Sequence, residues 1–311
     1  MEPALRNRLT YGPMMIAALS LLLWLDEAIE KWTQNWHWFS QTTGEPIPHG
    51  LQGVGLIILL LIVAPIATTE IAILFTAERV RPYRIIATIG SSVLAIHAFL
   101  TQFESFRVIA ASTMAFIIVF VMIGAALRRA WDRSTHDAIV RMAGTVLATL
   151  YLGGLGWFIM AIRVKQSHRF AGSTYMVLMI LFVVKATDIG AYFGGRALGR
   201  HKLIPWLSPG KTWEGLLCGV LFSGLVGSIM SPKLPGHMGM HPWKGFVFGV
   251  VIGAIGQVGD LLESLMKRDA EVKDSGRLVP GFGGVLDIID SPLFASPFAY
   301  LLFSLFARIH Y

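Results

Sequence analysis

The sequence predicts an all-α integral membrane protein with about nine transmembrane helices. Of its 311 residues, 54% are hydrophobic and only 14% are charged, and the mean hydropathy of +0.62 lies well above that of soluble proteins. Apolar runs of about 20 residues, long enough to cross a bilayer as helices, recur along the chain. We expect spans at roughly 11–29, 54–77, 85–102, 108–127, 139–162, 174–194, 212–230, 245–266 and 291–307.

The basic residues predict how these spans are oriented. A cytoplasmic N-terminus places about twice as many Lys and Arg residues on the cytoplasmic side as on the other side, as the positive-inside rule requires. One loop does not fit this orientation, because Arg163, Lys165 and Arg169 cluster on the outer side. A missed or extra helix before this loop is therefore an alternative. The segment MEPALRNRLTYG is not followed by a small-residue cleavage site, so we expect the first apolar run to be a retained helix.

Charge and composition also exclude some classes of function. The net charge of +7 fits the positive-inside bias and contact with anionic lipid headgroups. This charge does not need a nucleic-acid partner to explain it, and the sequence contains no nucleic-acid-binding motif. The lone Cys218 excludes an intrachain disulfide. Gly245, Gly249 and Gly253 lie four residues apart in an apolar run, a spacing that favours close helix packing over a role in chemistry.

The densest group of charges and glycines lies between Asp260 and Pro292, in DLLESLMKRDAEVKDSGRLVPGFGGVLDIIDSP. If the preceding helix continues, four polar side chains at spacing i, i+4, i+7 and i+8 share one face, namely Asp260, Ser264, Lys267 and Arg268. The segment KDSGRLVPGFGG then predicts a loop whose backbone can approach a ligand closely. The loop ends at Asp287 and Asp290, and Ser291 followed by Pro292 is typical of a helix start.

Carboxylates next to cations often form only a solvated network of salt bridges. Here the position of Asp260 at the end of an apolar run favours function, because an ionisable group near membrane depth is costly. Carboxylate oxygens suit a hard cation such as Mg²⁺, whereas Lys and Arg suit phosphate oxygens. The segment therefore predicts a site for a polyphosphate and magnesium.

The same segment resembles the C-terminal signature of phosphatidate cytidylyltransferases, also called CDP-diacylglycerol synthases. The matching positions are Ser264, Lys267, Arg268, Lys273, Asp274, Gly276, Pro280, Gly283, Gly284, Asp287 and Asp290. Two positions depart from the signature, with Phe282 in place of the usual His and Ile288 in place of the usual Arg. Upstream, KATDIGAYFGGRALGRHKLIPWLSPGKTWEG at 185–215 is similar to the second motif block of the family.

This resemblance implies an enzyme of phospholipid biosynthesis that converts CTP and phosphatidic acid into CDP-diacylglycerol and pyrophosphate. It implies Mg²⁺ held by Asp260 and Asp287, with a second cation open, and adds Lys267 and Lys273 to the catalytic set. The implied substrate-binding residues are Ser208, Lys211, Ser264, Arg268, Asp274, Gly283, Gly284, Asp290 and Asp188.

The resemblance also implies an organisation and a location. We expect one membrane domain over 1–311, with N-terminal helices in 1–170 and the catalytic region in 171–311. The implied location is a bacterial-type inner membrane with the active site facing the cytoplasm. The implied partners are CTP, phosphatidic acid and membrane lipids. A homodimer is a further alternative.

Several alternatives remain open at this point. Asp188 could pair merely with Lys185 one turn away, and Glu70 and His97 inside spans are more often packing partners than site residues. CTP-dependent prenol kinases share features of this architecture, and another lipid phosphate could be the acceptor. A transporter would also place ionisable residues at membrane depth, and an inactive paralogue would fit the changes at Phe282 and Ile288.

Overall fold

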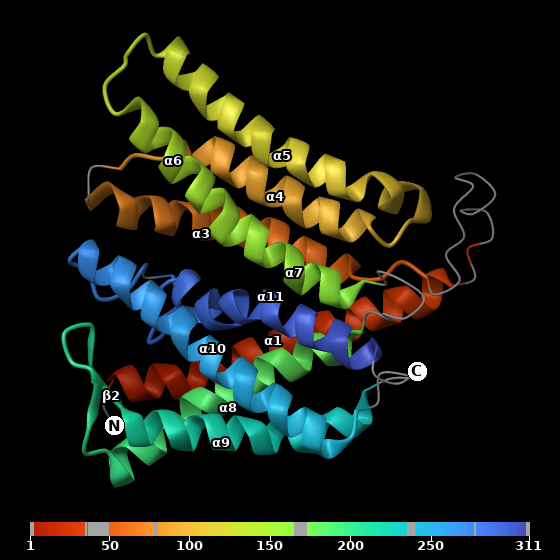
Figure 1. The fold of residues 1–311 in the computed structure, drawn as a ribbon, viewed down its shortest axis with the longest axis vertical. Coiled ribbons are helices and arrows are strands. Elements are labelled where there is room, and N and C mark those ends of the chain that lie inside the picture. The colour runs from red at the N-terminus through yellow and green to blue at the C-terminus, as the bar shows by residue number, and fades with distance from the viewer. Residues whose placement is uncertain are drawn as a thin grey trace. The chain divides into compact units, whose positions relative to one another are not determined.

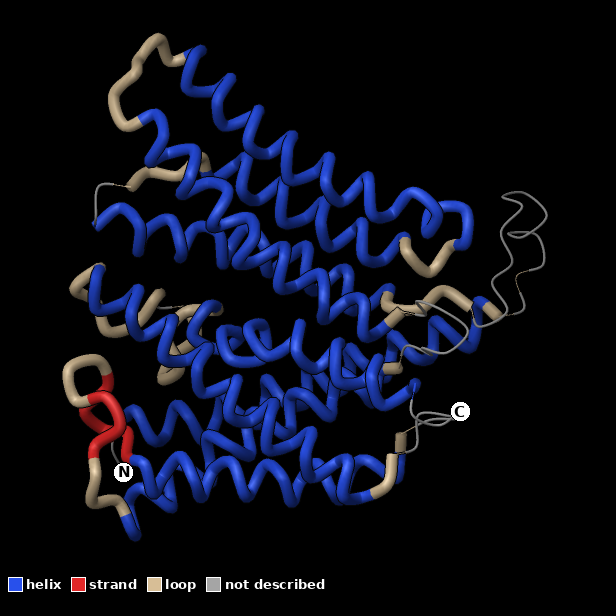
Figure 2. Tube along the Cα trace, in the orientation of Figure 1, coloured by secondary structure: helices blue, strands red, loops and turns tan. Residues whose placement is uncertain are grey.

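The computed structural model describes residues 3–34, 36, 50–77, 80–164, 173–234, 240–276 and 278–308. Within these ranges the chain is almost entirely helical, as Figure 1 and Figure 2 show. Among the described residues, eight helical segments are long and apolar enough to cross a membrane, one of them the continuous stretch Ala138–Arg163. Arg84–Leu100 is a shorter apolar helix of 17 residues. The predicted all-α membrane class is confirmed, and a helix lies at each of the predicted spans.

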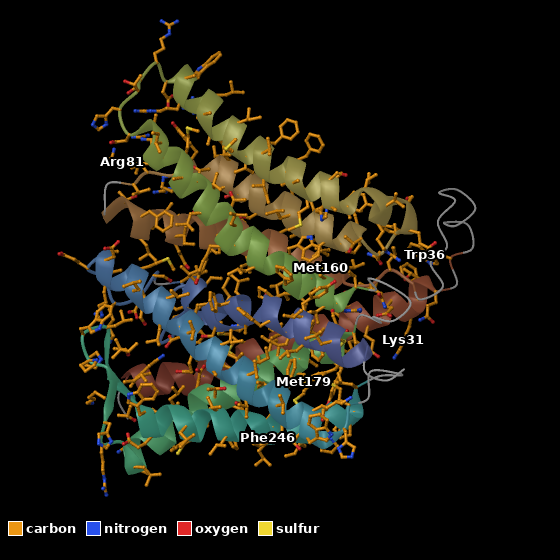
Figure 3. All side chains as sticks on the ribbon, viewed as in Figure 1. Lys31, Trp36, Arg81, Met160, Met179 and Phe246 are labelled. Carbon is orange, nitrogen blue, oxygen red and sulfur yellow. The ribbon has the colours of Figure 1, made fainter. Side chains whose placement is uncertain are left out.

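The surface of the helices agrees with a lipid environment. Large apolar side chains are exposed along the helices, including Phe116 and Phe120 on one helix. Phe246 on another helix is also exposed and is labelled in Figure 3. Water would disfavour such a surface, whereas hydrocarbon tails would not. Other apolar side chains, such as Met160 and Met179, are fully buried between helices.

The chain divides into two units, of which the first comprises Met1–Lys165 and Asp269–Ile288. Helix α4 (Arg84–Leu100) packs against α3 (Val54–Ala77), α5 (Glu104–Trp131) and α7 (Leu155–Arg163) (Figure 1). A π-helical segment, Leu150–Gly154, joins α6 (Ala138–Thr149) to α7. The helices that lie wholly in this unit are α1 (Pro3–Thr33), α3 (Val54–Ala77), α4 (Arg84–Leu100), α5 (Glu104–Trp131), α6 (Ala138–Thr149) and α7 (Leu155–Arg163).

A buried ion network connects three helices of this first unit. The Arg163 side chain at the end of α7 is fully buried and donates to Asp26 at 2.5 Å and to Glu30 at 2.7 Å, both on α1. Asp26 also accepts a hydrogen bond from the backbone N–H of Gly55 in α3, at 2.7 Å. The charge of Arg163 is therefore neutralised inside the protein and does not act as a loop charge. Lys165 and Arg169 lie outside the described residues.

The second unit comprises Gln166–Arg268 and Ile289–Tyr311. It contains α8 (Thr174–Leu198), α9 (Trp213–Met230), the short 3₁₀ turn Ser231–Lys233, most of α10 (Pro242–Asp269) and most of α11 (Leu286–Arg308). Between α8 and α9 lies a hairpin of β1 (Lys202–Ile204) and β2 (Ser208–Thr212), drawn in red in Figure 2. The strands are antiparallel, with Lys202 opposite Thr212 and Ile204 opposite Ser208.

Small residues allow the helices of the second unit to approach one another closely. A methyl group on Gly190 of α8 would lie 2.9 Å from Cα of Gly219 in α9, and one on Gly249 of α10 would collide with the backbone of Ser223 in α9. The Ser223 hydroxyl donates to the Gly249 carbonyl at 2.9 Å. These glycines therefore serve helix packing, as the spacing of Gly249 with Gly245 and Gly253 predicts.

Candidate active site

The SPGKT motif forms β2 and leads directly into α9. Thr212 caps this helix, because its hydroxyl accepts a hydrogen bond from the N–H of Gly215 at 3.1 Å. Glu214 in the first turn accepts from the N–H of Arg200 at 3.1 Å and contacts Nδ1 of His201 at 2.6 Å. Both ends of the hairpin are thus tied to the start of α9.

The hairpin meets the C-terminal part of α10 through two contacts. The Lys211 ammonium forms an ion pair with the Asp260 carboxylate. Nε of Arg268 donates to the carbonyl of Leu207, in the hairpin turn, at 3.4 Å. The structure therefore brings together residues from the two motif blocks of the sequence, about 50 positions apart along the chain.

Asp188 on α8 has two partners in the same unit. Its Oδ2 lies 3.4 Å from the ammonium of Lys185, one turn away, and its Oδ1 accepts from the amide of Gln257 on α10 at 2.8 Å. The pairing with Lys185 that the spacing allows is therefore present. The bond to Gln257 additionally connects α8 to the helix that carries Asp260.

Three carboxylates converge in the second unit. One oxygen each from Asp260, Glu263 and Asp290 lies within 4.8 Å of the other two. Asp260 is partly buried, whereas Glu263 and Asp290 are only 1% and 2% exposed. Lys267 donates to Glu263 at 2.7 Å, and Lys211 pairs with Asp260. We call this group of three acids the carboxylate cluster.

The carboxylate cluster has the donor chemistry of a site for a hard cation. Anionic oxygens held this close repel one another strongly where water is scarce. Lys211 and Lys267 offset part of this charge, and a divalent cation with oxygen ligands would offset the rest. The residues present therefore fit Mg²⁺.

Glu263 is a member of the carboxylate cluster that the sequence interpretation missed. The residue lies three positions after Asp260 in α10, and side chains at this spacing are neighbours on a helix. The signal was therefore present in the sequence, but the family signature begins at Ser264. The predicted partnership of Asp260 with Asp287 joins residues of two separately described units and stays a prediction.

The glycine-rich loop, residues 275–285, is described except at position 277 and belongs to the first unit, where it makes a tight turn. Phe282 N–H bonds to the Val279 carbonyl at 3.0 Å, with Pro280 and Gly281 between them. Gly281 has φ +87°, so the turn has the proline and the positive φ of type II. Gly283, at φ +101°, then exchanges two backbone hydrogen bonds with Val279.

Asp287 connects the two ends of this glycine-rich loop. Its Oδ2 accepts from the N–H of Ser275 at 3.0 Å, from the Ser275 hydroxyl at 2.9 Å and from the N–H of Gly284 at 2.7 Å. A methyl group on Gly283 would collide with the same oxygen. Asp287 therefore has a structural partner set in addition to the metal-binding role predicted for it.

Helix α11 begins at Leu286, which corrects the predicted start at Ser291. The reason is a buried carboxylate on α3. Glu70 accepts hydrogen bonds from the N–H groups of Val285 at 3.0 Å and Leu286 at 2.7 Å. These first amides of the helix have a partner, so the helix can start earlier, and Pro292 lies inside it.

The other predicted site residues divide between the two units. Ser208 and Ser264 are partly buried, and Arg268 is exposed, in the second unit. Lys273 and Asp274 are exposed just before the glycine-rich loop in the first.

The two positions that depart from the signature are partly buried in the first unit. Phe282 lies against α1, since a methyl group on Gly12 would contact its ring at 3.4 Å. Ile288 lies in the first turn of α11 and is also partly buried. Phe282 therefore packs against a neighbouring helix.

The fold and the site define an all-α membrane protein with a basic, carboxylate-rich centre. The chain belongs to the cytidylyltransferase family, whose model matches residues 49–306. The resemblance predicted from the two motif blocks is thereby confirmed.

Individual relatives match over shorter stretches. The phosphatidate cytidylyltransferase of Bacillus subtilis is 38% identical over 161 residues, 52% of this chain and 58% of the relative. That of Staphylococcus epidermidis is 44% identical over 126 residues, 40% of this chain and 48% of the relative. The uncharacterized protein YnbB of Escherichia coli is 36% identical over 162 residues, 52% of each. The matches span about half the length of these curated relatives.

Proposed function

We propose that this protein is a phosphatidate cytidylyltransferase, which transfers the cytidylyl group of CTP to phosphatidic acid and releases pyrophosphate. The observation that carries the proposal is the carboxylate cluster next to Lys211 and Lys267. Two relatives named phosphatidate cytidylyltransferase support the same activity. We further propose that the protein resides in a bacterial inner membrane with this site facing the cytoplasm, which the positive-inside bias supports.

In this proposal the acidic residues hold Mg²⁺. Asp260 would bind it together with Glu263 and Asp290, which lie near it in the second unit. By the family resemblance, Asp287 is a further ligand of the ion. A second cation at this site remains an alternative. A bound divalent ion would neutralise charge on the triphosphate and on the departing pyrophosphate.

The basic and hydroxyl side chains bind the two phosphate substrates. Lys211 and Arg268 reach the site from the hairpin side of α10, where they can contact the CTP phosphates. Lys267 and Lys273 provide further positive charge for the lipid phosphate, and Ser208 and Ser264 provide hydrogen-bond donors. Asp274 would orient these cations rather than bind phosphate itself.

The reaction requires little acid–base chemistry from the protein. The phosphate of phosphatidic acid is already anionic, so an oxygen of this phosphate can attack the α-phosphorus of CTP directly. As that bond forms, the bond from the α-phosphorus to the bridging oxygen of the β-phosphate breaks, and pyrophosphate leaves with the electron pair. The protein contributes by holding two mutually repelling anions in line.

The experiment that tests this proposal follows two labels in CTP. Detergent-purified protein is incubated with Mg²⁺, phosphatidic acid and CTP labelled at either the α- or the γ-phosphate. We expect the α-label in the lipid fraction and the γ-label in pyrophosphate. A γ-label in lipid would indicate a kinase and overturn the proposal, as would no transfer by folded protein.

A further inference from the structure

The strongest unexplained feature outside the carboxylate cluster is an acid inside a membrane span. Glu70 lies on α3 with 6% of its surface exposed. It stands seven residues before the end of α3 at Ala77, about 10 Å inside that end at the rise of an α-helix. A buried ionised group at this depth is costly unless specific partners stabilise it.

Among the described residues, the hydrogen-bond partners of Glu70 belong to one segment. Its carboxylate accepts from the N–H groups of Val285 at 3.0 Å and Leu286 at 2.7 Å, and the Ser275 hydroxyl lies 3.4 Å from Oε2. A methyl group on Gly276 would lie 2.5 Å from Oε1, and one on Gly284 would lie 2.6 Å from Oε2. The backbone of the glycine-rich loop therefore closes around this single carboxylate.

This arrangement satisfies both the acid and the loop. The first N–H groups of a helix carry partial positive charge and stabilise an anion. Irregular backbone at membrane depth is tolerated only where the protein satisfies its polar groups. Glu70 supplies such acceptors for the loop, so each partner compensates for the cost of burying the other.

We propose that Glu70 is a positioning residue, which holds the glycine-rich loop and the start of α11 in the geometry in which the signature residues act. It touches no substrate in this role and works through the loop, which Lys273 and Asp274 precede and Asp287 follows. The catalytic consequence rests on the proposed cytidylyltransferase activity. The effect of Glu70 on the loop does not depend on that activity, because it follows from hydrogen bonds within the first unit.

The test compares Glu70→Gln with Glu30→Gln in the purified protein. Both changes convert a membrane-helix glutamate to its amide, but the partners of Glu30 among the described residues are Arg163 and Gln52. Hydrogen exchange of the peptide 275–286 is followed by mass spectrometry. We expect exchange in Glu70→Gln to be about 10-fold faster or more, because hydrogen bonds to a charged acceptor are lost. Glu30→Gln should leave the exchange of this peptide unchanged.

Turnover provides the second readout. In Glu70→Gln we expect kcat to fall about 10-fold or more, while KM for CTP stays within about 3-fold, since misplaced loop residues weaken transition-state contacts. Glu70→Asp, which keeps the charge, should restore part of both loop protection and kcat. If Glu70→Gln does not fold, Gly284→Ala tests the same cluster of contacts from the loop side, because its methyl group would press on the Ser275 hydroxyl and on Oε2 of Glu70.

The outcomes separate the two proposals. Unchanged exchange of the loop peptide in Glu70→Gln would overturn the positioning role, whatever the activity. Faster loop exchange with KM raised and kcat unchanged would also overturn it. No cytidylyl transfer by the wild type would overturn the proposed function alone, and the exchange comparison would still decide the role of Glu70.

Discussion

In the first unit the carboxylates of Glu70 and Asp287 are surrounded by N–H and O–H donors of one loop, whereas in the second unit those of Asp260, Glu263 and Asp290 converge on one another. The residue types are the same and all five lie near or within apolar helices. What differs is the group that each oxygen meets.

The difference separates carboxylates that organise the loop from carboxylates that need a cation, and Asp287 combines the first role with its proposed role as a metal ligand. A carboxylate that accepts several backbone hydrogen bonds is stabilised as it stands, and removing it releases the loop. Carboxylates that face one another are stabilised only when positive charge joins them. Lys211 and Lys267 supply part of this charge, and in our proposal Mg²⁺ supplies the remainder. The surroundings of an acid therefore indicate its role better than its depth in the membrane does.

The largest effect is expected at the carboxylate cluster. Asp260→Asn removes one of three converging charges and the partner of Lys211, so the rate of CTP-dependent transfer should fall on the order of 1,000-fold. The rate is measured with α-labelled CTP. The control Asp132→Asn breaks an ion pair with Arg128 on α5 and should leave the rate within about 2-fold. Wild-type turnover in Asp260→Asn would contradict the assignment of the cluster to chemistry.

Disrupting the buried ion network of the first unit is expected to lower the stability of the protein strongly. Substrate affinity should not change. Asp26→Asn leaves the buried Arg163 with one fewer anionic partner, at a cost of about 3 kcal/mol of unfolding free energy. Thermal unfolding in detergent should show a lower Tm, and KM for CTP in the surviving folded protein should not change. A raised KM with an unchanged Tm would show that this network serves the site.

A smaller effect is expected where the glycine-rich loop meets Asp287. Gly283→Ala places a side chain at φ +101° and presses it against Oδ2 of Asp287, which should cost about 2 kcal/mol. We expect faster hydrogen exchange of the loop and roughly 10-fold slower turnover. Gly124→Ala on α5, where the nearest neighbour would be 3.8 Å away, is the matched control and should behave as wild type. Equal exchange in the two variants would argue against a structural role of Asp287.

The smallest effect is expected at a position that departs from the family signature. Phe282→His restores the usual residue at a partly buried place against Gly12, and the smaller His ring introduces no clash there. The transfer rate should stay within about 3-fold of the wild-type rate. A collapse of activity would mean that the site has adapted to Phe282.

The helices could be predicted from the sequence because apolar runs and their length depend on local composition alone. The motif residues could be assigned to a site because the resemblance covers them. The role proposed for Glu70 could not be predicted, because it depends on backbone amides more than 200 positions later in the chain. The same contact explains why α11 begins before Ser291–Pro292, the start that the local sequence predicts. Arg163 likewise looked like a loop charge because its buried partners on α1 are invisible in the local pattern.

The most direct test of the division between the two groups of carboxylates is a titration of the purified protein with Mn²⁺, a paramagnetic substitute for Mg²⁺, followed by electron paramagnetic resonance without CTP. We expect the wild type and Glu30→Gln to bind the ion with the same affinity. Asp290→Asn, which removes one acid of the carboxylate cluster, should bind it about 100-fold more weakly. Equal binding by Asp290→Asn and the wild type would contradict the account, because the cation would then be held elsewhere.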